Sequence, residues 1–223
     1  REYQVSSNFG VMDTCGFAKD DYYYYKSLFD RTPLVHIMPH WTWPIEGVIK
    51  TIRVYTNCEE IELLLNGESL GKKPLEADWV EYQVPYKSGR LEAVGYKAGK
   101  VVTSDVKETA GAPAKIILSV NREAINPDGK DVAFVTAQIC DKDGTIVPDA
   151  ENYVTFDVTG AGRLLGLGNG DPGSRENDKA GGRRAFSGLL MALIQSSGTQ
   201  GGTITVSASS ASLKGSVLTI RSE

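Results

Sequence analysis

Few residues of this 223-residue sequence have the types and spacing that catalysis or metal binding requires. Its two histidines, His36 and His40, are four residues apart, so a helix or an extended segment would place both on one face. A helix is disfavoured here by Pro33, Pro39 and Pro44, and no third zinc ligand accompanies the pair. We therefore expect both imidazoles to form structural hydrogen bonds.

Two further segments have compositions that could suit an ion or a phosphate. Asp141–Gly144 contains clustered carboxylates but lacks the later ligands of an EF-hand loop, so we predict a hairpin turn. Gly166–Pro172 is glycine-rich but lacks the Lys-Ser/Thr pair of a phosphate-binding P-loop. It predicts a tight loop between strands, with a surface site for an ion or a sugar at Asn169 and Asp171 as the alternative. No metal site and no cofactor are expected.

Hydrolytic chemistry is not marked by any arrangement of residues in the chain. Glycoside hydrolysis needs two carboxylates at a fixed separation, and no pair stands out among the acidic residues on or beside predicted strands. The Gly-x-Ser-x-Gly motif of serine hydrolases is absent. The cysteines are widely spaced and odd in number, so we expect buried free thiols at Cys15, Cys58 and Cys140.

The composition restricts the classes of partner. The net charge of −4 at pH 7 provides no electrostatic reason to expect binding to nucleic acid or to an anionic membrane. No apolar run approaches the roughly 20 residues that span a bilayer. A content of 41% hydrophobic residues is ordinary for a globular protein with a sizeable core.

Residues 1–32 differ from the rest of the chain because they contain the one helical pattern. We expect Asp20 to cap a helix that begins at the tyrosine run. In that helix Tyr22, Tyr25 and Phe29 would share one face, and so wide an aromatic surface needs a partner to pack against. The pattern favours a docking helix over a platform for sugars.

From about residue 33 the hydrophobic pattern changes to a period of two, which is typical of β-strands. Asn66-Gly67 predicts a two-residue hairpin turn, since both residues tolerate positive φ. The segment Glu108–Pro113, with its small residues and proline, predicts a domain junction. On either side of it, short alternating strands extend over about 100 residues, as in an immunoglobulin-like sandwich. We predict an all-β fold of two tandem immunoglobulin-like β-sandwiches.

Several motifs in matching order carry a resemblance to a known family. The run Ser6–Asp20, the tyrosine-rich segment after it and Pro39-His40-Trp41-Thr42-Trp43 resemble the end of the catalytic region of glycoside hydrolase family 2, particularly β-galactosidase-like members. The chain departs from that pattern at Ala18, where the family usually has proline, and at Thr42, where it usually has asparagine. The hairpin after Ile61, the loop Asn169–Pro172 and the run Arg184–Gly188 extend the resemblance to almost the whole chain.

The resemblance implies that catalysis belongs to a larger protein. Family members are retaining glycosidases whose two catalytic glutamates lie on a (β/α)₈ barrel, upstream of the segment that this chain resembles. A barrel needs about 250 residues, more than the chain contains. The implied organisation is residues 1–32 as a short helical remnant of the barrel, 33–110 as the first sandwich and 111–223 as the second.

Two functions of different classes follow. The leading hypothesis is a non-catalytic C-terminal accessory fragment of a β-galactosidase-like enzyme, inactive alone, with the barrel of its parent as partner. In that parent, placed by the resemblance in the bacterial periplasm or outside the cell, Phe17 and Lys19 would border the substrate site. The alternative is a carbohydrate-binding module in which exposed indole rings stack on sugars, with Trp41, Trp43 and Trp79 as candidates.

Overall fold

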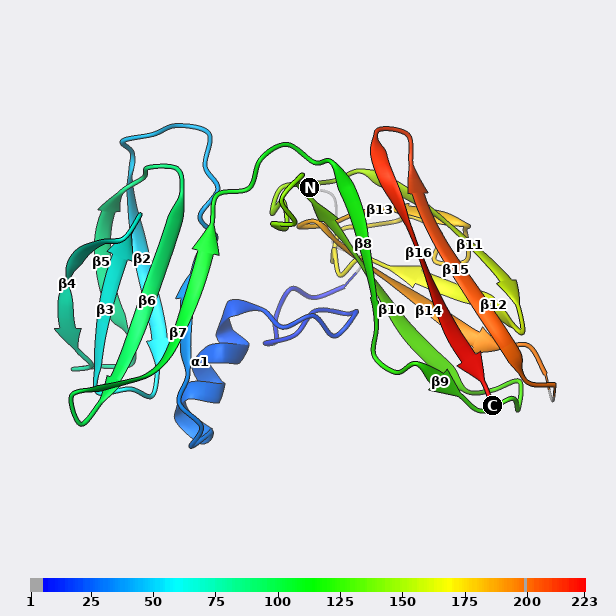
Figure 1. The fold of residues 1–223 in the computed structure, drawn as a ribbon, viewed down its shortest axis with the longest axis horizontal. Helices are drawn as coiled ribbons and strands as arrows, with labels where there is room; N and C mark the ends of the chain where they lie inside the picture. Colours follow the sequence, from blue (N-terminus) through cyan, green and yellow to red (C-terminus); the bar gives the residue numbers. More distant parts are fainter. Residues whose placement is uncertain (1–5, 199) are drawn as a thin grey trace. The chain divides into compact units, whose positions relative to one another are not determined.

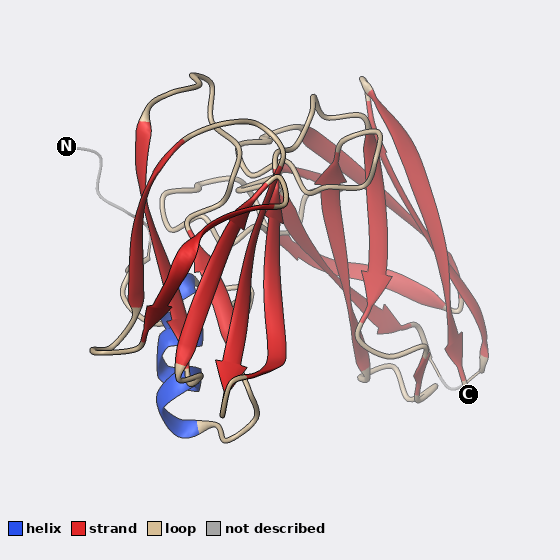
Figure 2. Ribbon diagram, turned by 60° about the vertical axis from the view of Figure 1, so that its left-hand side comes forward, coloured by secondary structure: helices blue, strands red, loops and turns tan. Residues whose placement is uncertain are grey.

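The computed structural model describes residues 6–198 and 200–223, which fold into two compact units. The C-terminal unit contains Gly111–Glu223 together with residues 6–9 and Asp13–Phe17, and the N-terminal unit contains Gly10–Met12 and Ala18–Ala110. Apart from one helix, the regular structure of the described residues is entirely β (Figure 2). The expectation of an all-β chain is therefore confirmed.

The N-terminal unit consists of helix α1 and two antiparallel sheets (Figure 1). One sheet has the order β1-β2-β5 and the other the order β4-β3-β6-β7. Both sheets contribute to one core, because alternate residues of β2 and β5 in one sheet and of β3 and β6 in the other are buried, among them Ile52, Val54, Ile61 and Leu63. The bounds are α1 Asp20–Phe29, β1 Val35–Met38, β2 Ile49–Thr56, β3 Glu60–Leu65, β4 Glu68–Pro74, β5 Val80–Pro85, β6 Arg90–Lys97 and β7 Lys100–Glu108.

The predicted turn between β3 and β4 is confirmed. Asn66 and Gly67 have φ values of 52° and 85°, as a two-residue hairpin turn requires. The Asn66 side chain also accepts a hydrogen bond from the Arg90 N–H at 2.8 Å and donates one to the Ser88 carbonyl at 3.0 Å. This turn is therefore held both by its own backbone and by the neighbouring strand.

The C-terminal unit forms a continuous path of paired strands in the order β12-β14-β10-β8-β16-β15-β11-β13, with β9 beside β16. The link between β8 and β16 is parallel and involves one residue pair, Lys115 and Lys214, so the path bends there into two antiparallel layers. Buried side chains alternate along the strands of both layers, including Val135, Ile194 and Val206. The bounds are β8 Lys115–Val120, β9 Ala124–Ile125, β10 Val132–Cys140, β11 Tyr153–Gly160, β12 Gly162–Gly168, β13 Gly182–Arg184, β14 Leu189–Ser196, β15 Gly202–Ser210 and β16 Leu213–Ser222.

Helix α1 differs in two respects from the sequence-based expectation. Its N-cap residue is Lys19, which makes no side-chain capping bond, so the prediction that Asp20 caps the helix is wrong. The Asp20 carboxylate instead lies 2.8 Å from Nε2 of His36 on β1. The helix packs on its own unit through Tyr23 and Tyr24, which lie outside the face of Tyr22, Tyr25 and Phe29 expected to need a partner. Tyr25 and Phe29 of that face are exposed.

Aromatic stacking joins α1 to the first sheet. The Tyr23 ring stacks on the buried His36 imidazole at 3.8 Å, and the Tyr24 ring meets Tyr55 of β2 at 5.3 Å. The Ser27 hydroxyl is buried at the same face and donates to the Tyr24 carbonyl at 2.6 Å. The expected structural role of His36 is therefore confirmed.

Helix α1 is the one helix of the described residues, and it is too short and too polar to cross a membrane.

A buried carboxylate holds the start of the C-terminal unit. Asp141 is 4% exposed, and its Oδ1 accepts hydrogen bonds from the N–H groups of Asp143, Gly144 and Thr145 at 2.8–3.0 Å. Its Oδ2 accepts from the Gly111 N–H at 2.8 Å. Burial alone would raise the pKa of Asp141, but these four donors together hold it below the usual value. The predicted turn at Asp141–Gly144 is confirmed, with Asp141 as its centre.

We expect Asp141→Asn to lower the free energy of unfolding by about 1–3 kcal/mol at pH 7, because the amide presents an N–H to one of the four buried donors. Because the pKa of Asp141 is lower in the folded than in the unfolded state, its ionised carboxylate stabilises the folded protein. This stabilisation is fully present above the unfolded-state pKa of about 4 and is lost as the pH falls through the folded-state pKa. Urea unfolding at pH 7 and pH 3 should therefore show a smaller difference between parent and variant at the lower pH. Asp143→Asn, at an exposed position, is the matched control; an equal effect of both variants would contradict the assignment.

Candidate functional site

A tight turn near the start of the chain is organised by Asp13. Its Oδ1 accepts hydrogen bonds from the Cys15 N–H at 2.8 Å and the Phe17 N–H at 2.9 Å. Its own N–H donates to the Phe17 carbonyl at 3.0 Å, which closes the turn. Asp13–Phe17 is therefore a locally determined unit that presents the side chains of Thr14 and Cys15.

This turn lies on the glycine-rich segment at the end of β12. A Cβ atom added to Gly168 would lie 2.5 Å from the Cys15 sulfur, and one added to Gly170 would lie 1.9 Å from Asp13 Oδ2. Gly170 also has a φ of +77°, which L side chains rarely adopt. The Ser6 N–H donates to the Pro172 carbonyl at 3.0 Å on the same side. Two motifs from opposite ends of the chain thus form one structural feature.

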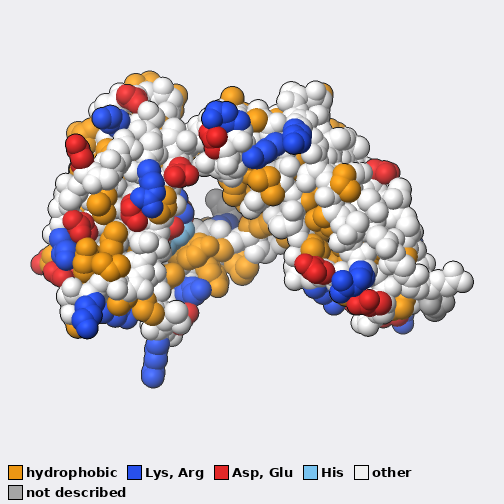
Figure 3. Space-filling model, viewed as in Figure 1, with side chains coloured by type: hydrophobic (Ala, Val, Ile, Leu, Met, Phe, Trp, Pro, Cys, Tyr) orange, Lys and Arg blue, Asp and Glu red, His pale blue; other side chains and the backbone are white. Residues whose placement is uncertain are grey.

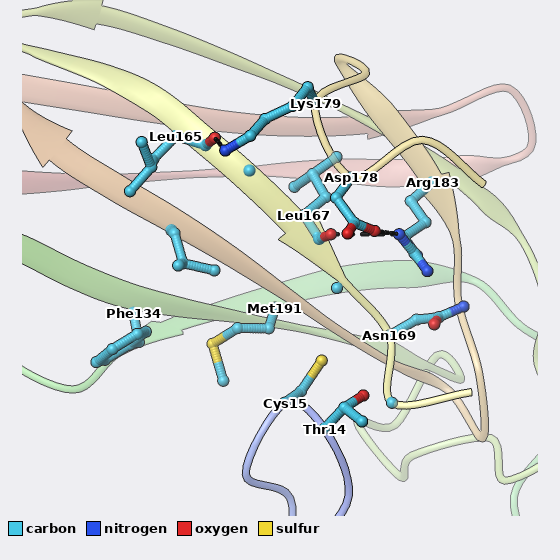
Figure 4. Close-up of a pocket in the computed structure, with 14 residues that line it drawn as sticks. Thr14, Cys15, Phe134, Leu165, Leu167, Asn169, Asp178, Lys179, Arg183 and Met191 are labelled. Atoms are coloured by element: carbon cyan, nitrogen blue, oxygen red, sulfur yellow. Dashed lines mark hydrogen bonds and ion pairs between the residues drawn. The ribbon is translucent and has the colours of Figure 1, made fainter. Parts of the chain in front are cut away.

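A cavity of about 430 Å³ lies beside this contact, within the C-terminal unit. Its apolar lining comes from neighbouring strands: Phe134 of β10, Leu165 and Leu167 of β12, and Met191 and Leu193 of β14. Figure 4 shows Thr14 and Cys15 at one end of the lining and Lys179, Asp178 and Arg183 at the other. Gly166 and Gly168 face Leu193 and Met191 in the pairing of β12 with β14, so the missing side chains leave space there.

The polar groups of the cavity are used to hold its walls. Arg183 is buried and pairs with the Asp178 carboxylate, while its Nη2 donates to the Ser174 hydroxyl at 3.0 Å. The Lys179 ammonium donates to the Leu165 carbonyl at 2.7 Å, and the Leu167 N–H donates to the Asp178 carbonyl at 2.8 Å. These bonds cover the free edge of β12 with the segment that leads to β13.

The glycine-rich loop also uses its own polar side chains internally. Asn169 is buried, donates to the Arg184 carbonyl at 3.1 Å and accepts from the Asp171 N–H at 3.1 Å. Asp171 Oδ1 accepts from the Gly173 N–H at 2.8 Å. The predicted loop between strands is confirmed for Asn169–Pro172, whereas Gly166–Gly168 are the last residues of β12. Within residues 6–198 and 200–223, no group of three His, Cys, Asp or Glu residues could hold a metal ion.

Cys15 is not activated for nucleophilic chemistry. Burial raises the pKa of its thiol, the Asp13 carboxylate raises it further, and the Gly170 N–H and Arg183 oppose this only in part. The thiol is therefore protonated at neutral pH and a poor nucleophile. Cys58 and Cys140 are buried free thiols, as expected, whereas Cys15 is only half-buried.

The three tryptophans occupy different environments in the N-terminal unit. Trp41 is 0% exposed and donates to the Lys87 carbonyl at 3.0 Å, so the proposed sugar stacking on its ring has no accessible face. The Trp43 ring is stacked by His40 at 4.5 Å and has the Lys50 ammonium 3.7 Å from its centre. Trp79 is half-buried and lines a surface groove.

The residues expected to border a substrate site are both half-buried but belong to different units. Phe17 closes the Asp13 turn of the C-terminal unit through its backbone. Lys19 is the N-cap of α1 in the N-terminal unit, and its N–H donates to the Val11 carbonyl at 2.9 Å. In the described part of the chain, the backbone hydrogen bonds of both residues hold local structure in place.

Comparison with known proteins identifies the family. Residues 116–219, from β8 to β16, match glycoside hydrolase family 2 C-terminal domain 5, and residues 47–103 match a domain of unknown function (DUF4982). The β-galactosidase BoGH2A of Bacteroides ovatus is 38% identical over 220 residues, which is 98% of this chain. The chain belongs to glycoside hydrolase family 2. It corresponds to C-terminal domains of that family and spans 26% of the length of BoGH2A.

Two further relatives support the assignment to family 2. A putative β-glucuronidase of Formosa agariphila is 39% identical over 169 residues, covering 73% of this chain and 16% of that protein. The crystal structure of a β-glycosidase from Bacteroides vulgatus superposes with a TM-score of 0.95 at 36% identity, over 98% of this chain and 28% of the other. The fold of this family 2 chain is thus shared almost throughout its length.

The contact between Cys15 and Gly168 was not predicted from the sequence. Glycines at 166, 168 and 170 recur every second residue, so in a strand they all face one side. That spacing indicates a strand face on which another segment of the chain packs closely, but it does not indicate which segment.

We expect Gly168→Ala to displace the Cys15 turn, because the added methyl would lie 2.5 Å from the sulfur. The free energy of unfolding of the variant should be lower by about 1–3 kcal/mol, and the Cys15 thiol should react faster with an aromatic disulfide reagent. Gly181→Ala is the control, since a Cβ there meets nothing within 4 Å. Unchanged thiol reactivity in Gly168→Ala would show that the close contact does not hold the turn.

Proposed function

We propose that this chain is the non-catalytic C-terminal accessory part of a retaining, β-galactosidase-like glycosidase, whose full-length protein hydrolyses O-glycosidic bonds in carbohydrates. One observation carries the proposal: 98% of the chain aligns with BoGH2A but accounts for only 26% of it. The same relation holds for the β-glycosidase structure, of which the chain covers 28%. The greater length of both relatives supports an active protein much larger than this chain.

We further propose the domain division expected from the sequence: a segment at 1–32 that ends the catalytic barrel, and immunoglobulin-like sandwiches at 33–110 and 111–223. The two-sheet core of the N-terminal unit and the two-layered C-terminal unit support the pair of sandwiches. Residues 1–5 lie outside the described part of the chain.

The carboxylates of the described residues support an accessory role. A retaining glycosidase needs two carboxyl groups about 5–5.5 Å apart on either side of the scissile bond. Asp141 is occupied by four backbone donors. A second cavity, of about 240 Å³, is lined by Glu151, Asp171 and Glu176, but Asp171 accepts from Gly173 and Glu176 accepts from the Arg184 N–H at 3.1 Å. These groups hold loops together.

The exposed side of α1 supports a protein partner. Tyr25, Leu28 and Phe29 form a stripe on the helix and are 50%, 52% and 81% exposed. Figure 3 shows hydrophobic side chains gathered over this helix. Since the opposite side is already packed on β1 and β2, a free hydrophobic stripe fits a helix that lies between two layers. The partner proposed for it is the catalytic barrel.

The isolated chain should not hydrolyse p-nitrophenyl β-galactoside or p-nitrophenyl β-glucuronide above the rate of a buffer blank. Glu176→Gln serves as a control for any residual signal, because Glu176 lines a cavity with two further carboxylates, Glu151 and Asp171. Hydrolysis by the purified chain that disappears in Glu176→Gln would overturn the non-catalytic role.

In the full-length enzyme, Leu28→Ser with Phe29→Ser should lower the melting temperature by several degrees, because the apolar stripe would lose buried area against the barrel. The same pair in the isolated chain should change the melting temperature little. Tyr24→Ala, which removes a contact within the unit, is the control and should destabilise both proteins. Equal small effects of the stripe variants in both proteins would contradict docking of α1 on the barrel.

Carbohydrate binding is a second candidate function, favoured by one observation. Of the three tryptophans, Trp79 lines a surface groove.

A further inference from the structure

The groove beside Trp79 lies between the end of β4 and the start of β5 in the N-terminal unit. Its volume is about 380 Å³, which is within the range of small-molecule sites. One wall is the indole of Trp79 with Pro74 and Ala77, and the polar groups around it come from Lys73, Glu76 and Glu81. An aromatic wall with several polar groups at its rim is the composition that a sugar ring requires, since a pyranose has an apolar face and a hydroxylated edge.

The indole is fixed by its neighbours. The edges of Tyr24 and Tyr55 approach it, with ring centres 6.4 Å and 6.2 Å away. The Arg53 guanidinium lies 5.0 Å from the centre of the ring and is held there by an ion pair with Glu81 at 3.1 Å. A ring that is already immobilised loses little conformational entropy when a ligand stacks on it.

The charges around the groove favour a neutral ligand. Arg53 is paired with Glu81, and the Lys73 ammonium donates to the Glu81 carbonyl at 2.7 Å. Glu76 is exposed and adds a negative charge, as does exposed Asp78 beside it in the sequence. Lys73 keeps its positive charge, because a carbonyl is neutral, but Glu76 and Asp78 together outweigh it. A carboxylate on the ligand would be repelled by this net negative charge, whereas sugar hydroxyl groups can donate to the two carboxylates.

We propose that this groove is a binding site for neutral pyranosides, with Trp79 as the stacking platform and Glu76 as an acceptor for sugar hydroxyls. The other indoles are less suitable. Trp41 is fully buried, and Trp43 has the His40 ring stacked on it at 4.5 Å and the Lys50 ammonium 3.7 Å from its centre. On Trp79 the neighbouring cation, Arg53, is farther away, at 5.0 Å, and the two tyrosine rings lie steeply inclined to the indole rather than stacked on it. The proposal rests on the second candidate function, carbohydrate binding, and names its site and ligand class. It is independent of the accessory role, because binding requires only the surface of the N-terminal unit.

The test is a titration of the full chain with lactose and with cellotetraose, in which binding is measured by tryptophan fluorescence and by saturation-transfer NMR. Methyl β-glucuronide is the anionic probe. We expect saturable binding of a neutral probe, weaker binding of the glucuronide, and a loss of affinity of about tenfold or more in Trp79→Ala. Because Trp79 also contacts Tyr24 and Tyr55, the exposed Glu76→Ala provides a second variant that leaves the packing intact, with an expected loss of a few-fold.

Trp43→Phe and Glu68→Ala are the matched controls, since neither residue lines the groove, and both should bind as the parent does. The proposal is overturned if neither neutral probe binds saturably, if Trp79→Ala and Glu76→Ala both bind as tightly as the parent, or if the glucuronide binds more tightly than the neutral sugars. None of these results bears on the docking of α1, which is measured by melting temperature.

Discussion

The C-terminal unit depends on a close approach that only glycine permits. The Asp13–Phe17 turn can lie on the end of β12 because Gly168 and Gly170 leave no side chain in its way. From that contact follow the end wall of the cavity, the position of the Cys15 thiol and the course of the chain after Gly170. Along the edge of β12, Lys179 donates to the Leu165 carbonyl and the Asp178 carbonyl accepts from the Leu167 N–H, so the segment that leads to β13 holds the strand as well.

The features that the sequence predicts well are those determined by neighbouring residues. Asn66-Gly67 specifies its turn through its own φ preferences, and Asp141 specifies its loop by accepting from residues two to four positions ahead. Alternation of apolar residues likewise identifies the strands and the all-β class, because each strand hides one face. The same logic located the glycine-rich loop before β13.

Long-range partners are less accessible to such reasoning. Tyrosine is amphipathic, so the pattern of the helix did not show that Tyr23 and Tyr24, rather than Tyr22 and Tyr25, face the sheet. The orientation of the helix is determined by the contacts of Tyr23 and Tyr24 with His36 on β1 and Tyr55 on β2. The partner of the Asp20 carboxylate, His36, is sixteen residues away, so the local sequence around Asp20 indicates a helix cap instead. Among the tryptophans, composition alone could not separate buried Trp41 from Trp79 at a groove.

The contact between Cys15 and Gly168 has a consequence for how the chain acquires its structure. Its two halves are separated by about two thirds of the 223-residue sequence, so the loop that must close is long and its closure costs entropy before any contact offsets that cost. During synthesis, at roughly 5–20 residues per second, the Asp13–Phe17 turn waits on the order of ten seconds for Gly168 and Gly170 to be made. The turn therefore reaches its final place only after the strand that receives it has been made.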